Sequence, residues 1–139
     1  MDLQLTGKIA VVTGGTRGIG KAIAHSLASE GMDVAIVGRD LEAATATASA
    51  ISSETRRTVK AYAADTGKDE AVRAAVAAIR SDFGRIDVLV NSAAQPSGQA
   101  KPPTLSEITD EMFWSDVNVK VMGYLRMARE IAPLMAEQG

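Results

Sequence analysis

Short apolar runs alternate along the chain with longer segments in which apolar residues recur every three or four positions. Short runs of this kind, bounded by polar or turn-forming residues, are typical of strands that are buried on both faces of a sheet. The sequence therefore predicts four short strands, at residues 9–12, 34–37, 59–63 and 86–90.

The longer segments predict helices, because an apolar residue at every third or fourth position forms a stripe along one side of a helix. The expected helices span residues 18–30, 41–53, 68–82 and 110–137. Gly31 follows the first helix, Asp40 is well placed to cap the second, and Gly84 closes the third. Residues 95–104 predict a loop, because they include Pro96, Gly98, Pro102 and Pro103.

Strands and helices that alternate in this way predict an α/β fold, in which helices cover both faces of a parallel sheet. Right-handed crossovers between the strands favour a doubly wound, Rossmann-type order. We expect one domain over residues 1–139, with ligands bound at the carboxyl ends of the strands.

The strongest local motif is Thr13-Gly14-Gly15-Thr16-Arg17-Gly18-Ile19-Gly20, which lies between the first strand and the first helix. Glycines in such a turn let the phosphates of a nucleotide approach the bare backbone and the positive end of the helix dipole. A tight turn that binds no ligand is the alternative, and three spaced glycines at this position make it the weaker one.

Two nucleotide-binding motifs are compatible with a glycine-rich turn. The phosphate-loop pattern G-x-x-x-x-G-K-[ST] fits from Gly15 to Lys21 but fails at Ala22, where a hydroxyl would ligate magnesium. No apolar strand ends in an aspartate that could hold the metal, so an ATPase or GTPase is disfavoured. The other motif is a dinucleotide site, although the glycine spacing differs from the generic G-x-G-x-x-G.

The spacing G-x-x-x-G-x-G resembles that of the short-chain dehydrogenase/reductase family. Three later landmarks extend the resemblance: Asp65 after the third strand, the segment Asn91-Ser92-Ala93-Ala94 at the end of the fourth, and Asn118 in the long helix. Ser92 and Ala94 replace an Asn and a Gly of the family's Asn-Asn-Ala-Gly. The resemblance covers only the N-terminal half of the family's domain, so the sheet would be truncated after the fourth strand and the long helix.

The resemblance implies that the chain binds a nicotinamide cofactor, with Asp65 at the adenine and Asn118 as the asparagine of the catalytic tetrad. The residues that it assigns to cofactor binding are Gly14, Thr16, Arg17, Gly18, Ile19, Gly20, Arg39, Asp65, Asn91 and Ala93.

The second strand indicates which nicotinamide cofactor is preferred. An acidic residue at its end would bind the ribose hydroxyl of NAD, but Gly38 and Arg39 stand there instead. Arg39 and Arg17 could together bind a 2′-phosphate, which predicts NADP(H) over NAD(H). The alternative for Arg39 alone is a solvated loop arginine. Asp40 could serve NAD, but helix capping explains it better.

The family's chemistry depends on a Ser and on a Tyr-x-x-x-Lys pair, in which the lysine lowers the pKa of the tyrosine. Neither Tyr62 nor Tyr124 is followed by a lysine four positions on, and Lys120 precedes Tyr124 on what we expect to be helix surface. We therefore expect this chain alone to be inactive, with Asn118 a remnant and His25 solvated. Two hypotheses remain: the cofactor-binding portion of an NADP(H)-dependent oxidoreductase that acts on a carbonyl or alcohol substrate, or a non-catalytic dinucleotide-binding or oligomerisation module.

Composition narrows the possible partners. A formal net charge of −2 gives no reason to expect nucleic acid or an anionic membrane, and the absence of cysteine with a single histidine argues against a metal site. No signal peptide or membrane-spanning run is visible, which favours the cytoplasm. Since the 110–137 helix carries more apolar surface than four strands can cover, we expect a homo-oligomer formed through it.

Overall fold

The structure, a computed structural model, describes residues 1–95 and 101–139. Its strands are β1 (Ile9–Thr13), β2 (Asp33–Gly38), β3 (Val59–Ala63) and β4 (Val88–Asn91). The helical elements are α1 (Gly18–Ser29), α2 (Leu41–Thr55), α3 (Asp69–Phe83), the 3-10 turn η1 (Leu105–Glu107), α4 (Asp110–Val117), the π-helical turn η2 (Asn118–Met122) and α5 (Gly123–Gln138). The predicted strands and helices are therefore confirmed, with differences at two of them.

The four strands form one parallel sheet in the order β3-β2-β1-β4. The chain builds β2 and β3 on one side of β1 and then crosses back to place β4 on the other side. The strand order reverses between β1 and β4, and in open α/β sheets ligands bind at the carboxyl ends of the strands beside such a reversal.

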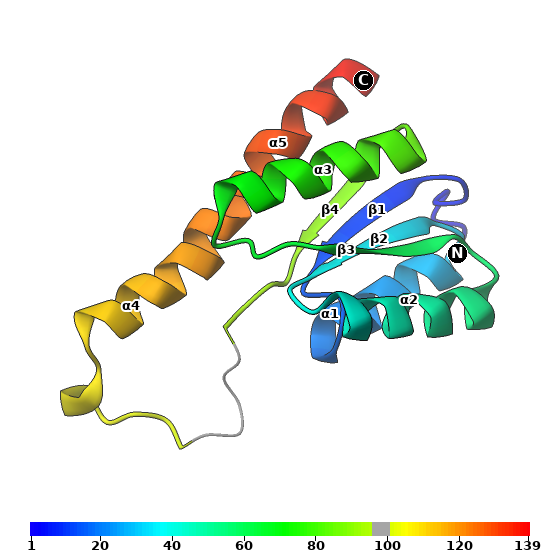
Figure 1. Cartoon of the computed structure of the whole chain (residues 1–139). Helices are drawn as coiled ribbons and strands as arrows, with labels where there is room; N and C mark the ends of the chain where they lie inside the picture. The colour runs from blue at the N-terminus through cyan, green and yellow to red at the C-terminus, as the bar shows by residue number, and fades with distance from the viewer. Residues whose placement is uncertain (96–100) are drawn as a thin grey trace.

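Helices cover both faces of the sheet, as Figure 1 shows, with α1 and α2 on one face and α3 and α5 on the other. Successive side chains of a strand point to opposite faces. Ala10 and Val12 of β1 accordingly pack with α1 and α2, whereas Val11 packs with α3 and α5. The doubly wound, Rossmann-type α/β fold predicted from the sequence is confirmed.

The fourth strand is shifted relative to its prediction at residues 86–90. It spans Val88–Asn91, although Ile86 is fully buried in the core. The backbone of Ile86 pairs with the side-chain amide of Gln138 at the end of α5: its N–H donates to Oε1 at 3.1 Å and its carbonyl accepts from Nε2 at 2.9 Å. A side chain thus takes the place of a neighbouring strand, which apolar patterning cannot reveal.

The long helix predicted at 110–137 is helical throughout from Asp110 to Gln138. Its α-helical turns change to a wider π turn at Asn118–Met122 and then resume. A π turn inserts one residue into a helix and shifts the register of everything after it. The β3–α3 loop lies close to the helix directly after this turn, because a Cβ added to Gly123 would stand 2.9 Å from Oγ1 of Thr66. The helix meets the loop closely here, and the extra residue turns Gly123 toward it.

The helix ends follow the predictions closely. Asp40 Oδ1 accepts a hydrogen bond from the N–H of Ala43 at 3.0 Å, and Gly31 and Gly84 adopt positive φ angles of 94° and 78°.

Of the predicted loop at 95–104, Pro96 and Gly98 lie outside the described residues. His25, predicted to be solvated, is partly exposed and bonds Glu54 of α2 at 2.9 Å. Within the part of the chain that the structure describes, no helix is both long and apolar enough to cross a lipid bilayer.

Candidate functional site

The carboxyl ends of all four parallel strands lie at one edge of the sheet (Figure 1). The segments that follow the strands carry most of the sequence-predicted residues. The glycine turn follows β1, Arg39 follows β2, Asp65 follows β3, and Asn91 ends β4. Because the strands are parallel, residues far apart in the chain become neighbours at this edge. The fold thus assembles one candidate site from four separate segments.

The three spaced glycines are required for two different reasons. A Cβ at Gly14 would lie 2.7 Å from the carbonyl oxygen of Ser92, and one at Gly20 would lie 2.2 Å from the carbonyl oxygen of Gly14. Both positions are therefore too close to backbone for any side chain. Gly18 differs, since nothing lies within 4 Å of its Cβ position and its φ of 56° alone disfavours other residues. The space above Gly18 is open.

The first turn of α1 faces the same open space. Arg17 is its N-cap residue and makes no side-chain capping bond, and among residues 1–95 and 101–139 no side chain accepts from the N–H groups of the first turn. Ile19, the second residue of α1, is 77% exposed. A helix start with available N–H groups, beside bare glycine backbone, can receive an anionic group such as a phosphate.

Thr13 fastens the end of β4 to the glycine turn, a role that sequence reasoning missed. Its buried hydroxyl accepts hydrogen bonds from the N–H groups of Ser92 at 3.1 Å and Ala93 at 3.2 Å, and it donates to the carbonyl of Val90 at 3.4 Å. The segment after Asn91 is thereby held beside Gly14. A threonine at the end of a buried strand needs partners for its hydroxyl, and that need was the signal available in the sequence.

The two arginines that were predicted to act together flank a contact between two segments. Thr16 Oγ1 would stand 2.5 Å from a Cβ on Gly38, so the residue before Arg17 lies against the residue before Arg39. Thr47 of α2, also missed from sequence, supports this contact by donating its hydroxyl to the carbonyl of Thr16 at 2.9 Å. Both arginines are exposed, and over residues 1–95 and 101–139 neither guanidinium has a hydrogen-bond or ion-pair partner.

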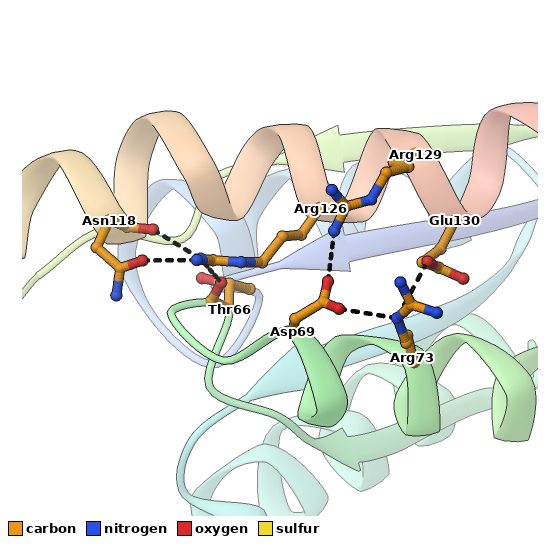
Figure 2. Close-up of polar contacts among 7 residues, drawn as sticks. All are labelled: Thr66, Asp69, Arg73, Asn118, Arg126, Arg129 and Glu130. Carbon is orange, nitrogen blue, oxygen red and sulfur yellow. Dashed lines mark hydrogen bonds and ion pairs between the residues drawn. The ribbon is translucent and has the colours of Figure 1, made fainter.

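Asp65 and Asn118 lie in one polar cluster between the β3–α3 loop and the long helix, where both bond the backbone of Gly67; Figure 2 shows the Asn118 side of this cluster. Asp65 Oδ1 accepts from the N–H of Gly67 at 2.9 Å, and Asn118 Nδ2 donates to the carbonyl of Gly67 at 3.1 Å. Asn118 Oδ1 accepts from Nη2 of Arg126 at 2.8 Å. Asn118 therefore uses both ends of its amide to bind protein groups.

Arg126 was not singled out in the sequence. It stands eight positions after Asn118, a spacing that separates two residues by about 80° around a regular helix. The extra residue of the π turn makes the separation equivalent to about seven, or two full turns, and so brings the two side chains to the same side. Without knowledge of the π turn, the pairing has no sequence signal.

The surroundings of Tyr62 disfavour the proton transfer that the family's tyrosine performs. Burial, together with the hydrogen bond that its hydroxyl donates to Asp82 at 2.6 Å, raises the pKa of Tyr62 well above its usual range. An acid–base tyrosine requires a shift in the opposite direction. Lys120, four positions before Tyr124, pairs with Asp116 at 3.0 Å on the surface of the long helix.

A glycine turn at the point where strand order reverses in a doubly wound sheet defines a Rossmann-type domain. The sequence matches the family described as short chain dehydrogenase over residues 8–139. The chain belongs to this family, as its resemblance had indicated.

Individual relatives cover the whole of the chain. A D-threitol dehydrogenase of Mycolicibacterium smegmatis is 35% identical over 138 residues, which are 99% of this chain and 51% of that protein. The crystal structure of L-sorbose reductase from Gluconobacter frateurii, complexed with NADPH and L-sorbose, matches with a TM-score of 0.90 and 35% identity over 100% of this chain and 51% of its own. An NAD+-bound xylitol dehydrogenase matches with a TM-score of 0.88 and 27% identity, over 97% of this chain and 50% of its own.

The chain thus spans about half the length of the curated relatives it matches. The residues of this chain that match the family, 8–139, include its four-stranded sheet and its glycine turn.

Proposed function

We propose that residues 1–139 form the cofactor-binding part of an NADP(H)-dependent oxidoreductase that interconverts a carbonyl and an alcohol. Membership of the short chain dehydrogenase family supports the class of reaction. The single observation that carries the proposal is the open space over Gly18, where bare backbone and the start of α1 meet at the edge of the sheet.

The residues at this edge fit a dinucleotide. The backbone from Gly14 to Gly20 would hold the pyrophosphate, because its glycines leave room and the N–H groups of α1 are available as donors. Exposed Ile19 would cover one side of the bound cofactor. When bound, the cofactor supplies the hydride that the substrate carbonyl receives.

Two exposed arginines support a preference for NADP(H). Thr16 and Gly38 are in contact, and Arg17 and Arg39 directly follow them. The two arginine side chains are therefore attached to neighbouring positions on the surface. A 2′-phosphate there would receive charge-assisted hydrogen bonds from planar donors. Solved relatives include one with NADPH and another with NAD+, so the argument for the preference rests on the two arginines.

The remaining site residues take the roles that the family resemblance implies. Asp65 would contact the adenine, while Asn91 and Ala93 would line the cofactor where Thr13 holds the end of β4. Asn118 would belong to the catalytic region, acting from the π turn. We assign no proton transfer to Tyr62, whose raised pKa keeps its phenol protonated.

The cofactor preference is tested by titrating the chain with NADPH and with NADH and measuring the two dissociation constants. We expect NADPH to bind more tightly, and Arg39→Asp to reduce the preference by about tenfold to a hundredfold, since a charge-assisted hydrogen bond contributes about 1.5–3 kcal/mol.

The matched control is Arg56→Asp, which makes the same change of charge at the carboxyl end of α2, away from the site. This control should bind both cofactors as the parent chain does. Equal affinity of the parent chain for NADPH and NADH would refute the NADP(H) preference, and binding of neither would refute the proposed function.

A second function, self-association, is favoured by a specific observation. Five large apolar side chains are exposed on the long helix: Met112, Phe113, Trp114, Val121 and Leu125. Exposed apolar surface concentrated on one element commonly marks an interface. We propose that this helix joins copies of the chain, whether or not the chain takes part in catalysis.

A further inference from the structure

Arg126 of α5 makes three hydrogen bonds to the cluster that contains Asn118, and no role has been assigned to it. Nη1 donates to the carbonyl of Thr66 at 2.9 Å and to the carbonyl of Asn118 at 3.1 Å, while Nη2 donates to Oδ1 of Asn118 at 2.8 Å (Figure 2). One guanidinium thus joins the β3–α3 loop to the π turn of the long helix.

The loop that Arg126 holds is the one that carries Asp65. Thr66 is 5% exposed and its carbonyl is fixed by Arg126, while the next carbonyl, that of Gly67, accepts from Asn118. Asp65 in turn accepts from the N–H of Gly67. The side chain of Asp65 is therefore oriented by a turn whose two central carbonyls are both bound from the long helix.

The fit of this cluster is close. A Cβ at Gly67 would lie 3.0 Å from Asn118 Nδ2 and 3.0 Å from Asp65 Oδ1, and a Cβ at Gly123 would lie 2.9 Å from Thr66 Oγ1. The loop and the helix therefore touch at glycines on both sides. Any displacement of the helix would be transmitted to the turn that orients Asp65.

We propose that Arg126 is a positioning residue, which fixes the Asp65 turn against the π turn and so shapes the adenine end of the cofactor site. The proposal rests on the proposed function, because it assumes that Asp65 contacts the adenine. Arg126 itself touches no cofactor in this scheme. Without its guanidinium, the Thr66 carbonyl and Asn118 Oδ1 would lose their donors, and the turn would have to be ordered when the ligand binds.

The test compares Arg126→Met with Arg129→Met in the full chain. Both changes remove a guanidinium from α5, but Arg129 pairs with Asp69 on α3 and does not bond the turn or Asn118 (Figure 2). The ligands are NADP+ and adenosine 2′,5′-bisphosphate, which carries the adenine end without the nicotinamide. We expect Arg126→Met to weaken both by about tenfold, equal to a change of about 1.4 kcal/mol, and Arg129→Met to change neither.

A double-mutant cycle separates positioning from general destabilisation. If Arg126 acts through the Asp65 turn, Arg126→Met should cost little further affinity in an Asp65→Ala background. Fully additive losses would overturn the proposal. Arg126→Lys, which keeps the charge but loses the planar fork, should show an intermediate loss, and this variant decides the matter if Arg126→Met fails to fold.

The outcomes distinguish this inference from the function on which it rests. Failure of the parent chain to bind either ligand would defeat the proposed function. Binding by the parent chain that is unchanged in both Arg126→Met and Arg126→Lys would leave the proposed function intact and overturn the role of Arg126 alone.

Discussion

Gly18 and Gly84 both have a positive φ angle but lie at opposite ends of the sheet. Their φ angles are 56° and 78°, and at both positions a Cβ would meet nothing within 4 Å. An alanine at either position would therefore pay the same kind of conformational cost, about 1–2 kcal/mol for a left-handed residue. Only Gly18 faces the proposed phosphate site, so the two glycines separate a structural effect from a binding effect.

We predict that Gly18→Ala and Gly84→Ala lower the free energy of unfolding by similar amounts, as measured by urea denaturation. Gly18→Ala should also weaken NADPH binding by at least about tenfold, because its methyl group would occupy the space that the phosphates need. Gly84→Ala should leave the dissociation constant unchanged. Equal affinity of the two variants for NADPH would contradict the phosphate site.

Single residues could be predicted from the sequence where the site accepts only one residue type. They could not be predicted where the role of the residue depends on partners that are distant in the chain. Gly14, Gly18 and Gly20 were recognisable because a spaced set of glycines after an apolar strand has few explanations. Arg126 was not, because its partners Thr66 and Asn118 come together only through the fold. A basic residue on a helix has no pattern that distinguishes an interior role from a solvated one.

The α3 and α5 helices are joined by ion pairs as well as by their apolar faces. Asp69 at the start of α3 binds Arg73 of the next turn and Arg129 of α5, and Arg73 also lies 3.6 Å from Glu130 (Figure 2). The hydrogen bond from Arg73 lowers the pKa of Asp69, and the charges of Arg73 and Arg129 act in the same direction. The carboxylate therefore stabilises the folded state in its ionised form.

The lowered pKa predicts how stability depends on pH. A carboxyl whose folded pKa lies below its unfolded value contributes stability above that value, about pH 4, and the contribution is lost as the pH falls through the folded pKa. Asp69→Asn should therefore lower the free energy of unfolding at pH 7 and reduce its fall between pH 7 and pH 3.

The matched control for this prediction is Glu70→Gln, which removes a neighbouring charge from the same first turn of α3. Within the described part of the chain, Glu70 forms none of these ion pairs. Urea denaturation at several pH values measures both variants. An Asp69→Asn profile that matches the Glu70→Gln profile would show that the ion pairs contribute nothing beyond the helix dipole.

Element positions were predictable to the extent that burial determines them. The strands β1 and β2 lie where their apolar runs indicated, because both faces of the sheet are covered there, and the less buried edge strand β3 also lies at its predicted residues. The predicted start of β4 at residue 86 was wrong, since the backbone of Ile86 forms its hydrogen bonds with the side chain of Gln138 rather than with a strand. The π turn was also missed, and the close contact between Thr66 and Gly123 directly after it is a tertiary contact that local periodicity does not contain.

The molecule as a whole exposes its apolar surface unevenly. The exposed aromatic residues Phe113 and Trp114 lie on α4 with their ring centroids 5.4 Å apart, and Val121 and Leu125 continue the exposed apolar side chains along the helix. In Figure 1, α4 extends beyond the sheet, whereas α5 packs beside α3. The apolar side chains of α4 are therefore not packed against the sheet in this chain.

Self-association through this helix predicts a concentration-dependent mass. Sedimentation of the chain at micromolar concentration should show a dimer or larger species, and Trp114→Lys combined with Leu125→Lys should shift it to the monomer. Leu105→Lys serves as a control, since Leu105 is similarly exposed but lies on the separate turn η1. A parent chain that sediments as a monomer throughout this range would rule out the interface.

The contact between Thr16 and Gly38 limits how the coenzyme choice of this scaffold could be re-engineered. Introducing an acidic residue at 38, directly at the end of β2, would place its β-carbon 2.5 Å from Thr16 Oγ1, so the Thr16 side chain would have to move. The neighbouring position 39 is exposed and tolerates a change of charge without that collision. Laboratory evolution toward the other coenzyme should therefore accumulate substitutions at 39 and 17 while leaving 38 untouched.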